Sequence, residues 1–293
     1  MKAGPSEASS AARRYQALGL VVLAAALMSI GGLLIKLVTW HPVAIAGARS
    51  GIAVIALLVL AGRPRPTWST AQVLGAFCYT ATVLLFVIAN KLTTAANAIL
   101  LTFTSPIFAA LLGGWFLQER VRGRDWAALT ITVAAMILFF LDRLEPGNFL
   151  GNLCAIGSAV AFAGMLVSLR AQKSGSSVET FVLGGLITCF IGLPFMLRSA
   201  PGGAGWPGLI VLGVLQLALP FWLYSKALQQ LTALEASLAQ TVEPVLNPVW
   251  VFLATGETPG VWAVVGGITV LVTVTLRQFS DVLLRRLLHS SSK

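Results

Sequence analysis

Two stretches of the sequence decide the fold. Residues 94–119 read TAANAILLTFTSPIFAALLGGWFLQE, and residues 232–257 read TALEASLAQTVEPVLNPVWVFLATGE. Aligned with Thr94 on Thr232, they share a threonine-alanine pair at the start, a proline in the middle and a glutamate at the end. The same offset places Trp68 on Trp206. A constant offset that includes a tryptophan, a proline and a glutamate predicts that the chain consists of two related halves.

The composition predicts that both halves lie in a membrane. Of the 293 residues, 57% are hydrophobic and 10% are charged, and the mean hydropathy is +0.87. A soluble domain carries roughly 25% charged residues, so this chain has too little charge to cover a soluble surface. The same figures exclude a disordered chain, whose composition is polar and charged.

Apolar runs between charged, proline and glycine residues predict ten spanning helices, each near the roughly 20 residues that a bilayer requires. We expect a cytoplasmic segment at 1–17, a first repeat at 18–141, a second at 142–276 and a basic cytoplasmic tail at 277–293. The ten spans are 18–38, 42–61, 71–90, 94–116, 125–141, 149–169, 178–197, 207–227, 232–254 and 260–276.

The distribution of Lys and Arg predicts the orientation. With both termini in the cytoplasm, the inner loops and ends hold 15 of these residues and the outer loops hold three, Lys91, Arg143 and Arg198. Cytoplasmic loops of membrane proteins carry this excess. The net charge of +10 therefore marks topology and does not indicate nucleic-acid binding.

Five helices per half is an odd number, so the second half must be inverted relative to the first. We therefore predict an all-α membrane protein with two inverted five-helix repeats around a central cavity. Secondary transporters are built in this way, with the substrate site near the midplane where the repeats meet.

The strings at 97–120 (NAILLTFTSPIFAALLGGWFLQER) and 235–257 (EASLAQTVEPVLNPVWVFLATGE) resemble the paired fourth and ninth helices of EamA-type members of the drug/metabolite transporter superfamily. In that family each half has an alanine-rich helix that carries a proline and ends in Gly-Glu or similar; here the first half has Gln118-Glu119. The resemblance implies a ten-helix metabolite exporter of a bacterial inner membrane. Bacterial members include exporters of amino acids, aromatic ones among them.

The ninth span carries the main candidate site. Glu243 lies near its middle, where a carboxylate must face a cavity or a partner, or be protonated. Gln240, Asn247 and Pro244 share its helical face by their three- and four-residue spacing. Pro244 and Pro248 each remove a helical hydrogen bond, which predicts a kink with free carbonyl groups. Glu243 is either a contact for a substrate amine, a proton-coupling site or a structural hydrogen-bond partner.

The first half has less polar residues at the positions that correspond to this site, and its spans also carry two cationic residues. Thr102 and Pro106 correspond to Gln240 and Pro244. Arg49 lies within the second span, in a small-xxx-small pattern from Gly47 to Gly51 that permits close helix packing; it either pairs within the bundle or binds a substrate carboxylate. Lys36 lies near the outer end of the first span, where its amine either reaches the interface or faces the substrate.

Three aromatic residues with polar atoms lie inside spans: Tyr79, Trp222 and Tyr224. Buried groups of this kind find hydrogen-bond partners and stack on planar ligands. We count them as candidate substrate contacts, with lipid-facing or interfacial positions as the alternative.

Other classes of protein fit less well. The chain has two His, no HExxH or GxSxG motif and no cysteine pair at metal spacing, so we expect no enzyme, cofactor or metal site. Small four-helix multidrug antiporters use a Glu in the first helix, and residues 18–38 contain no acid. The remaining alternatives are a proton-coupled multidrug antiporter and a non-transport assembly protein. The expected partners are a small-molecule substrate and the lipid bilayer, and we expect a monomer.

Overall fold

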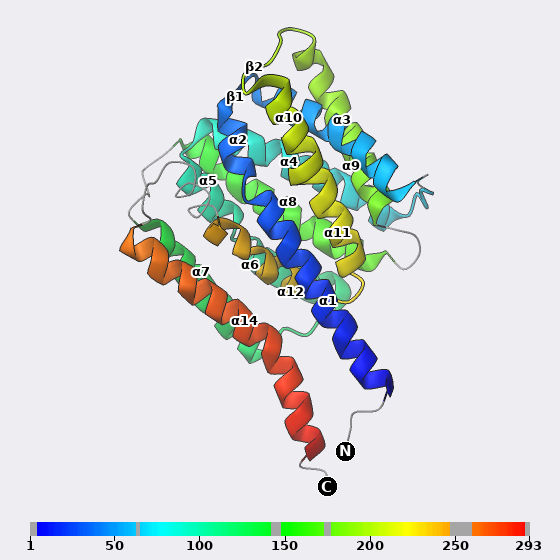
Figure 1. Ribbon diagram of the computed structural model, residues 1–293, viewed down its shortest axis with the longest axis vertical. Coiled ribbons are helices and arrows are strands. Elements are labelled where there is room, and N and C mark those ends of the chain that lie inside the picture. The colour runs from blue at the N-terminus through cyan, green and yellow to red at the C-terminus, as the bar shows by residue number, and fades with distance from the viewer. Residues whose placement is uncertain (1–4, 63–64, 142–147, 173–176, 247–259, 291–293) are drawn as a thin grey trace.

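The computed structural model describes residues 5–62, 65–141, 148–172, 177–246 and 260–290 as a bundle of helices (Figure 1). The elements are α1 (Pro5–Met28), α2 (Gly31–Leu37), β1 (Val38–Thr39), α3 (Pro42–Ala61), α4 (Thr70–Leu92), α5 (Ala95–Thr102), α6 (Ser105–Leu117), α7 (Gly123–Phe140), α8 (Phe149–Ala171), α9 (Val178–Met196), β2 (Gly202–Gly203), α10 (Gly205–Gly213), the π-helical turn η2 (Val214–Ala218), α11 (Leu219–Ala227), α12 (Ala233–Gln240) and α14 (Val261–Ser290).

The predicted fold class is confirmed. Within the described residues, each of the ten predicted spans falls on helical segments, and seven segments are long and apolar enough to cross a membrane. Helix also extends beyond the predicted spans: α1 begins at Pro5, inside the expected N-terminal segment, and α14 continues to Ser290, through most of the expected tail. Charged residues end an apolar span, but they do not end a helix.

The fourth and ninth spans are broken at equivalent places. Helix α5 ends at Thr102 and α12 ends at Gln240, which occupy matching positions in the two halves, as the two prolines do. A proline clashes with the carbonyl four residues before it and lacks an N–H. Pro106 therefore ends the first helix at Thr102, and Pro244 ends the second at Gln240. Both segments then resume as helices, α6 and residues 242–246.

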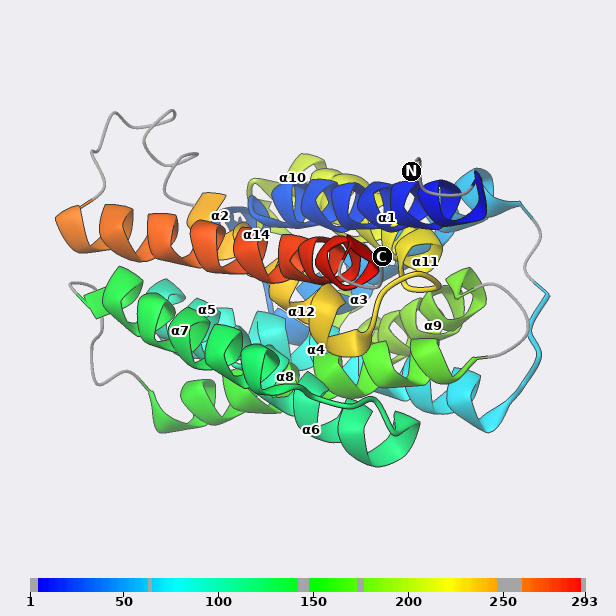
Figure 2. The same cartoon turned by 90° about the horizontal axis from the view of Figure 1, so that it is seen from below.

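The packing repeats across the two halves. Helix α4 packs on α8, and its repeat partner α11 packs in the same way on α1. Helix α3 packs on its own repeat partner α9, and α7 packs on its own repeat partner α14. Figures 1 and 2 both show α14 lying beside α7. The first and second repeats therefore exchange contacts throughout the bundle, as two inverted repeats require.

The two ends of the bundle differ. Both termini lie at one end, which we call the termini end (Figure 1). At the other end, the strand end, β1 pairs antiparallel with β2 through Val38 and Gly203, and the Lys91 amine donates to the Val38 carbonyl at 2.8 Å. This two-residue pairing is a small departure from the all-α prediction. It connects the first span to the loop before the eighth.

Helices α3 and α9 approach closely through glycine. A Cβ placed on Gly192 would lie 2.6 Å from the Gly47 Cα and 3.0 Å from the Val43 carbonyl oxygen. Gly51 gives similar room to Cys189, whose Sγ would lie 3.0 Å from an added Cβ. The small-xxx-small pattern therefore does bring the backbones together, and it holds Arg49 in the interior between them.

We expect Gly192→Ala to destabilise the protein by about 1–3 kcal/mol, because the methyl group overpacks a backbone contact that no rotamer relieves. Thermal unfolding of the purified protein in detergent measures the loss. Gly19→Ala is the matched control, since nothing lies within 4 Å of a Cβ there. Equal stability of the two variants would contradict close packing of α3 on α9.

Candidate functional site: a charged cavity between the broken helices

A cavity of about 60 Å³ lies between the two repeats, beside the breaks in the fourth and ninth spans. Its lining combines one carboxylate and one guanidinium with amides, hydroxyls and four phenylalanines. The lining residues are Met28, Arg49, Thr82, Val83, Phe86, Thr102, Phe103, Ser105, Ser158, Phe162, Gln216, Leu217, Phe221, Gln240 and Glu243.

A chain of hydrogen bonds orients the carboxylate. The Tyr224 hydroxyl donates to Gln240 Oε1, and Gln240 Nε2 donates to Glu243 Oε2. The same amide nitrogen lies 3.3 Å from the Met28 sulfur. Tyr224 and Gln240 are buried, so their polar atoms must be satisfied within the protein. The relay leaves Glu243 Oε1 as the oxygen through which the carboxylate can meet a ligand.

Arg49 supplies the opposite charge. Its side chain is 1% exposed, and Nη1 donates to Gln216 Oε1 at 2.8 Å. Gln216 belongs to the π-helical turn η2. Gly31 makes room for this amide, because a Cβ there would lie 2.7 Å from Gln216 Nε2. No ion pair joins Arg49 to a carboxylate of the described residues, so a buried cation remains uncompensated in the cavity wall.

Two polar atoms in the cavity wall lack a partner among the described residues: Arg49 Nε and Thr102 Oγ1. Leaving a buried donor unpaired costs about 1–3 kcal/mol, and more for a charged group. Such atoms are satisfied when a ligand or water occupies the site. The Ser105 and Ser237 hydroxyls, 3.2 Å apart, join the two broken helices next to it.

The structure brings four of the predicted binding residues together: Glu243, Gln240 and Thr102 line the cavity, and Tyr224 bonds to Gln240. Arg49 lines it as well.

Other predicted residues lie elsewhere. Tyr79 is fully buried behind the cavity, with its ring centroid 5.0 Å from that of Phe221. Trp222 lies outside the lining, and the Lys226 amine sits 3.4 Å from its ring centroid. Lys36 is exposed near the strand end. Asn247 and Pro248 lie outside the described residues.

Sequence reasoning missed Gln216, Ser158 and Thr82. The Ser158 hydroxyl donates to the Thr82 carbonyl at 3.1 Å in the cavity wall. A glutamine inside an apolar span was the available signal, because a primary amide in the membrane interior needs a partner. The small hydroxyl residues gave no comparable signal, since a Ser or Thr hydroxyl can bond to a carbonyl of its own helix, as Thr82 does to Cys78.

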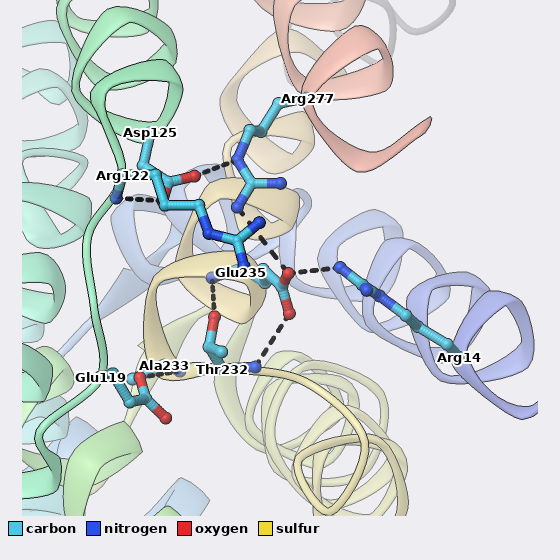
Figure 3. Close-up of polar contacts among 8 residues, drawn as sticks. All are labelled: Arg14, Glu119, Arg122, Asp125, Thr232, Ala233, Glu235 and Arg277. Carbon is cyan, nitrogen blue, oxygen red and sulfur yellow. Dashed lines mark hydrogen bonds and ion pairs between the residues drawn. The ribbon is translucent and has the colours of Figure 1, made fainter. Parts of the chain in front are cut away.

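A second polar cluster lies at the termini end (Figure 3). Glu235 caps α12 by accepting from the Thr232 N–H at 3.0 Å, and its other oxygen pairs with Arg14 and, at 3.8 Å, with Arg277. Arg277 also pairs with Asp125 at the start of α7. Arg277, the first residue of the predicted tail, therefore joins α14 to residues of both repeats.

Glu119 forms a looser pair beside this cluster. Its carboxylate accepts from Arg170 Nε and from the Ala233 N–H, both at 3.3 Å. Burial raises the pKa of Glu119 above its usual value, and the Arg170 guanidinium opposes that shift.

Two inverted repeats around a central polar cavity define a membrane transporter. Both halves match the EamA-like transporter family, over residues 16–141 and 149–277, and the chain belongs to that family.

Proteins with similar sequences carry the names of transporters or solute carriers. An uncharacterized transporter of Archaeoglobus fulgidus is 27% identical over 67% of this chain and 71% of its own length. Human solute carrier family 35 member G1 is 27% identical over 61% of this chain and 53% of its own length. The uncharacterized transporter YdfC of Bacillus subtilis is 23% identical over 62% and 61%. A solved crystal structure superposes with a TM-score of 0.74 at 18% identity, covering 89% of this chain and 97% of the other, which shows a shared fold.

Proposed function

We propose that the protein is a secondary transporter that exports a small organic metabolite, an amino acid or a related compound, by alternating access. The observation that carries this proposal is the pair of opposite charges in one cavity. Glu243 offers a carboxylate to an ammonium group, and Arg49 offers a guanidinium to a carboxylate. A zwitterion needs both, and the four phenylalanines suit an apolar side chain. Glu243 alone would favour a simple amine, and Arg49 alone would favour a simple acid.

The small size of the cavity supports movement of the repeats during transport. A volume of about 60 Å³ holds only a few water molecules, so a metabolite requires the surrounding helices to separate. The breaks after Thr102 and Gln240 supply hinges at the cavity, one in each repeat. Hinges at element ends are where such rearrangements are absorbed.

The Lys and Arg distribution supports an orientation with both termini in the cytoplasm, and the family resemblance supports a bacterial inner membrane. Within the described residues, Arg14, Arg170 and Arg277 gather at the termini end, whereas Lys91 and Arg198 lie toward the strand end. Export then runs from the termini end to the strand end.

The experiment is exchange in proteoliposomes with matched substrates: amino acids, the amines left by their decarboxylation and the acids left by removal of their amino group. We expect exchange of the zwitterions and weak exchange of both truncated series. Exchange of the amines equal to that of the amino acids would reject the role of Arg49. No exchange of any amino acid, with exchange of another metabolite class, would reject the substrate class.

We expect Arg49→Gln to weaken binding of the zwitterionic substrate by about 1.5–3 kcal/mol, because a charge-assisted hydrogen bond is lost. The corresponding amine should bind almost as before. Competition measurements in proteoliposomes, on protein that is monodisperse by gel filtration, test both statements. Arg198→Gln, toward the strand end, is the control. Equal losses for amino acid and amine would place Arg49 in a structural role.

A further inference from the structure

A second cavity, of about 340 Å³, opens at the termini end and is separate from the central cavity. It lies between the interiors of α1 and α14, the end of α8, the starts of α7 and α12 and the segment between α6 and α7. Its volume falls in the range of sites for small ligands. We call it the arginine pocket, after the six arginines in its lining: Arg14, Arg120, Arg122, Arg124, Arg170 and Arg277.

The arginine pocket has a large excess of positive charge. Against six arginines the lining has three carboxylates, Glu119, Asp125 and Glu235. One oxygen of each carboxylate accepts from a backbone N–H, and the other pairs with an arginine. The carboxylates therefore neutralise only part of the charge on the guanidinium groups. The remaining positive charge favours an anion from outside the protein.

Exposed aromatic rings place the pocket at the level of the membrane interface. Trp115 and Phe116, one turn before the pocket segment, are 76% and 66% exposed, and Trp126, just after it, is 43% exposed. Exposed tryptophans in a membrane protein mark the headgroup region of the bilayer. Basic pockets between helices at this depth bind anionic headgroups. Figure 3 shows Arg14, Arg122 and Arg277 reaching from three elements toward Glu235 in the pocket wall.

We infer that the arginine pocket binds a phosphate group, and that the phosphate belongs to the headgroup of an anionic phospholipid. Arginine matches phosphate because its planar fork donates two parallel hydrogen bonds to two oxygens. A bound headgroup would join α1, α7 and α14 and so hold the two repeats together at the termini end. This site is independent of the central cavity and of the substrate proposed for it.

The test is thermal unfolding of the full chain in an uncharged detergent, titrated with phosphatidylglycerol, with phosphatidylcholine or with inorganic phosphate. We expect phosphatidylglycerol to raise Tm more than phosphatidylcholine does. In the double variant Arg120→Gln, Arg124→Gln, the lipid concentration at half-maximal stabilisation should rise about 10- to 30-fold, because each arginine near an anionic headgroup contributes about 1 kcal/mol to binding. Arg120→Gln alone changes an exposed side chain and should give about a fivefold rise. Arg65→Gln, outside the pocket lining, should leave the titration unchanged.

The outcomes separate the possibilities. Equal shifts with the two lipids, or unchanged titrations in both pocket variants, would overturn the site. The same loss in Arg65→Gln would assign the effect to general surface charge and also overturn it. Full protection by inorganic phosphate, with nothing added by phosphatidylglycerol, would keep the phosphate site and reject the lipid as its source.

Discussion

Glu243→Gln should abolish accumulation of substrate driven by a pH gradient while downhill exchange continues. Glu243 is the carboxylate of the central cavity, and a charge there is costly unless it is compensated or protonated. In the alternating-access cycle proposed above, movement of the repeats would change its access to water, so proton binding and release would accompany each cycle. Glutamine keeps the shape and the bond to Gln240 but cannot titrate. Uptake into proteoliposomes between pH 5 and pH 8, with and without a gradient, measures the difference.

Other results for this variant would assign Glu243 differently. A loss of affinity by about 1.5–3 kcal/mol with unchanged pH dependence would keep Glu243 as the proposed contact for the substrate ammonium and reject its role in proton coupling. Lower Tm with normal transport per folded molecule would make it structural. Wild-type transport and stability across the whole range would remove it from the site. Glu179→Gln is the matched control, because Glu179 is a buried glutamate at the start of α9 that lies outside the cavity lining.

Glu235→Gln should lower the stability of the protein by about 3 kcal/mol. Glu235 and Arg277 are 5% and 8% exposed, and removing one member of a buried ion-pair cluster costs up to about 3–5 kcal/mol, although Arg277 keeps its pair with Asp125. The lower value applies because the arginine pocket is open to water. Here Arg14 loses its pairing with Glu235 as well. Chemical unfolding in mixed detergent measures the change.

Glu119→Gln is the control for this prediction. The Glu119 and Arg170 side chains are 17% and 27% exposed, and pairs near the surface contribute about 0–1 kcal/mol. Because the pKa of Glu119 is raised in the folded protein, the charged form is disfavoured by folding, and the stability it contributes is lost as the pH rises through that pKa. Glu119→Gln should therefore be neutral or slightly stabilising at pH 8. Equal losses of stability in Glu235→Gln and Glu119→Gln would reject Glu235 as the centre of the polar cluster at the termini end.

Much of the fold follows from local sequence. Apolar length predicts the spans, and the constant offset between the halves predicts that the fourth and ninth spans break at matching places. Each proline acts on a carbonyl only four residues away, so Thr102 and Gln240 as helix ends follow from Pro106 and Pro244 alone. The predicted positions of Glu243, Gln240 and Thr102 in one cavity follow from the same repeat.

The other features of the fold and of the candidate site depend on contacts between segments that are distant in the sequence. The sequence by itself determined the membrane class, the spans, the inverted repeat and the central position of Glu243, because each rests on hydropathy, parity or spacing along the chain. Tertiary structure alone decided that Arg49 bonds to Gln216, that Tyr79 lies behind the cavity, and that Arg277 joins Asp125 and Glu235. These partners come from different helices far apart in the chain, and helix rotation and depth select them. The hydropathy of a spanning helix is the same whichever face turns inward. Only the packing of the helices therefore shows which face lines the cavity.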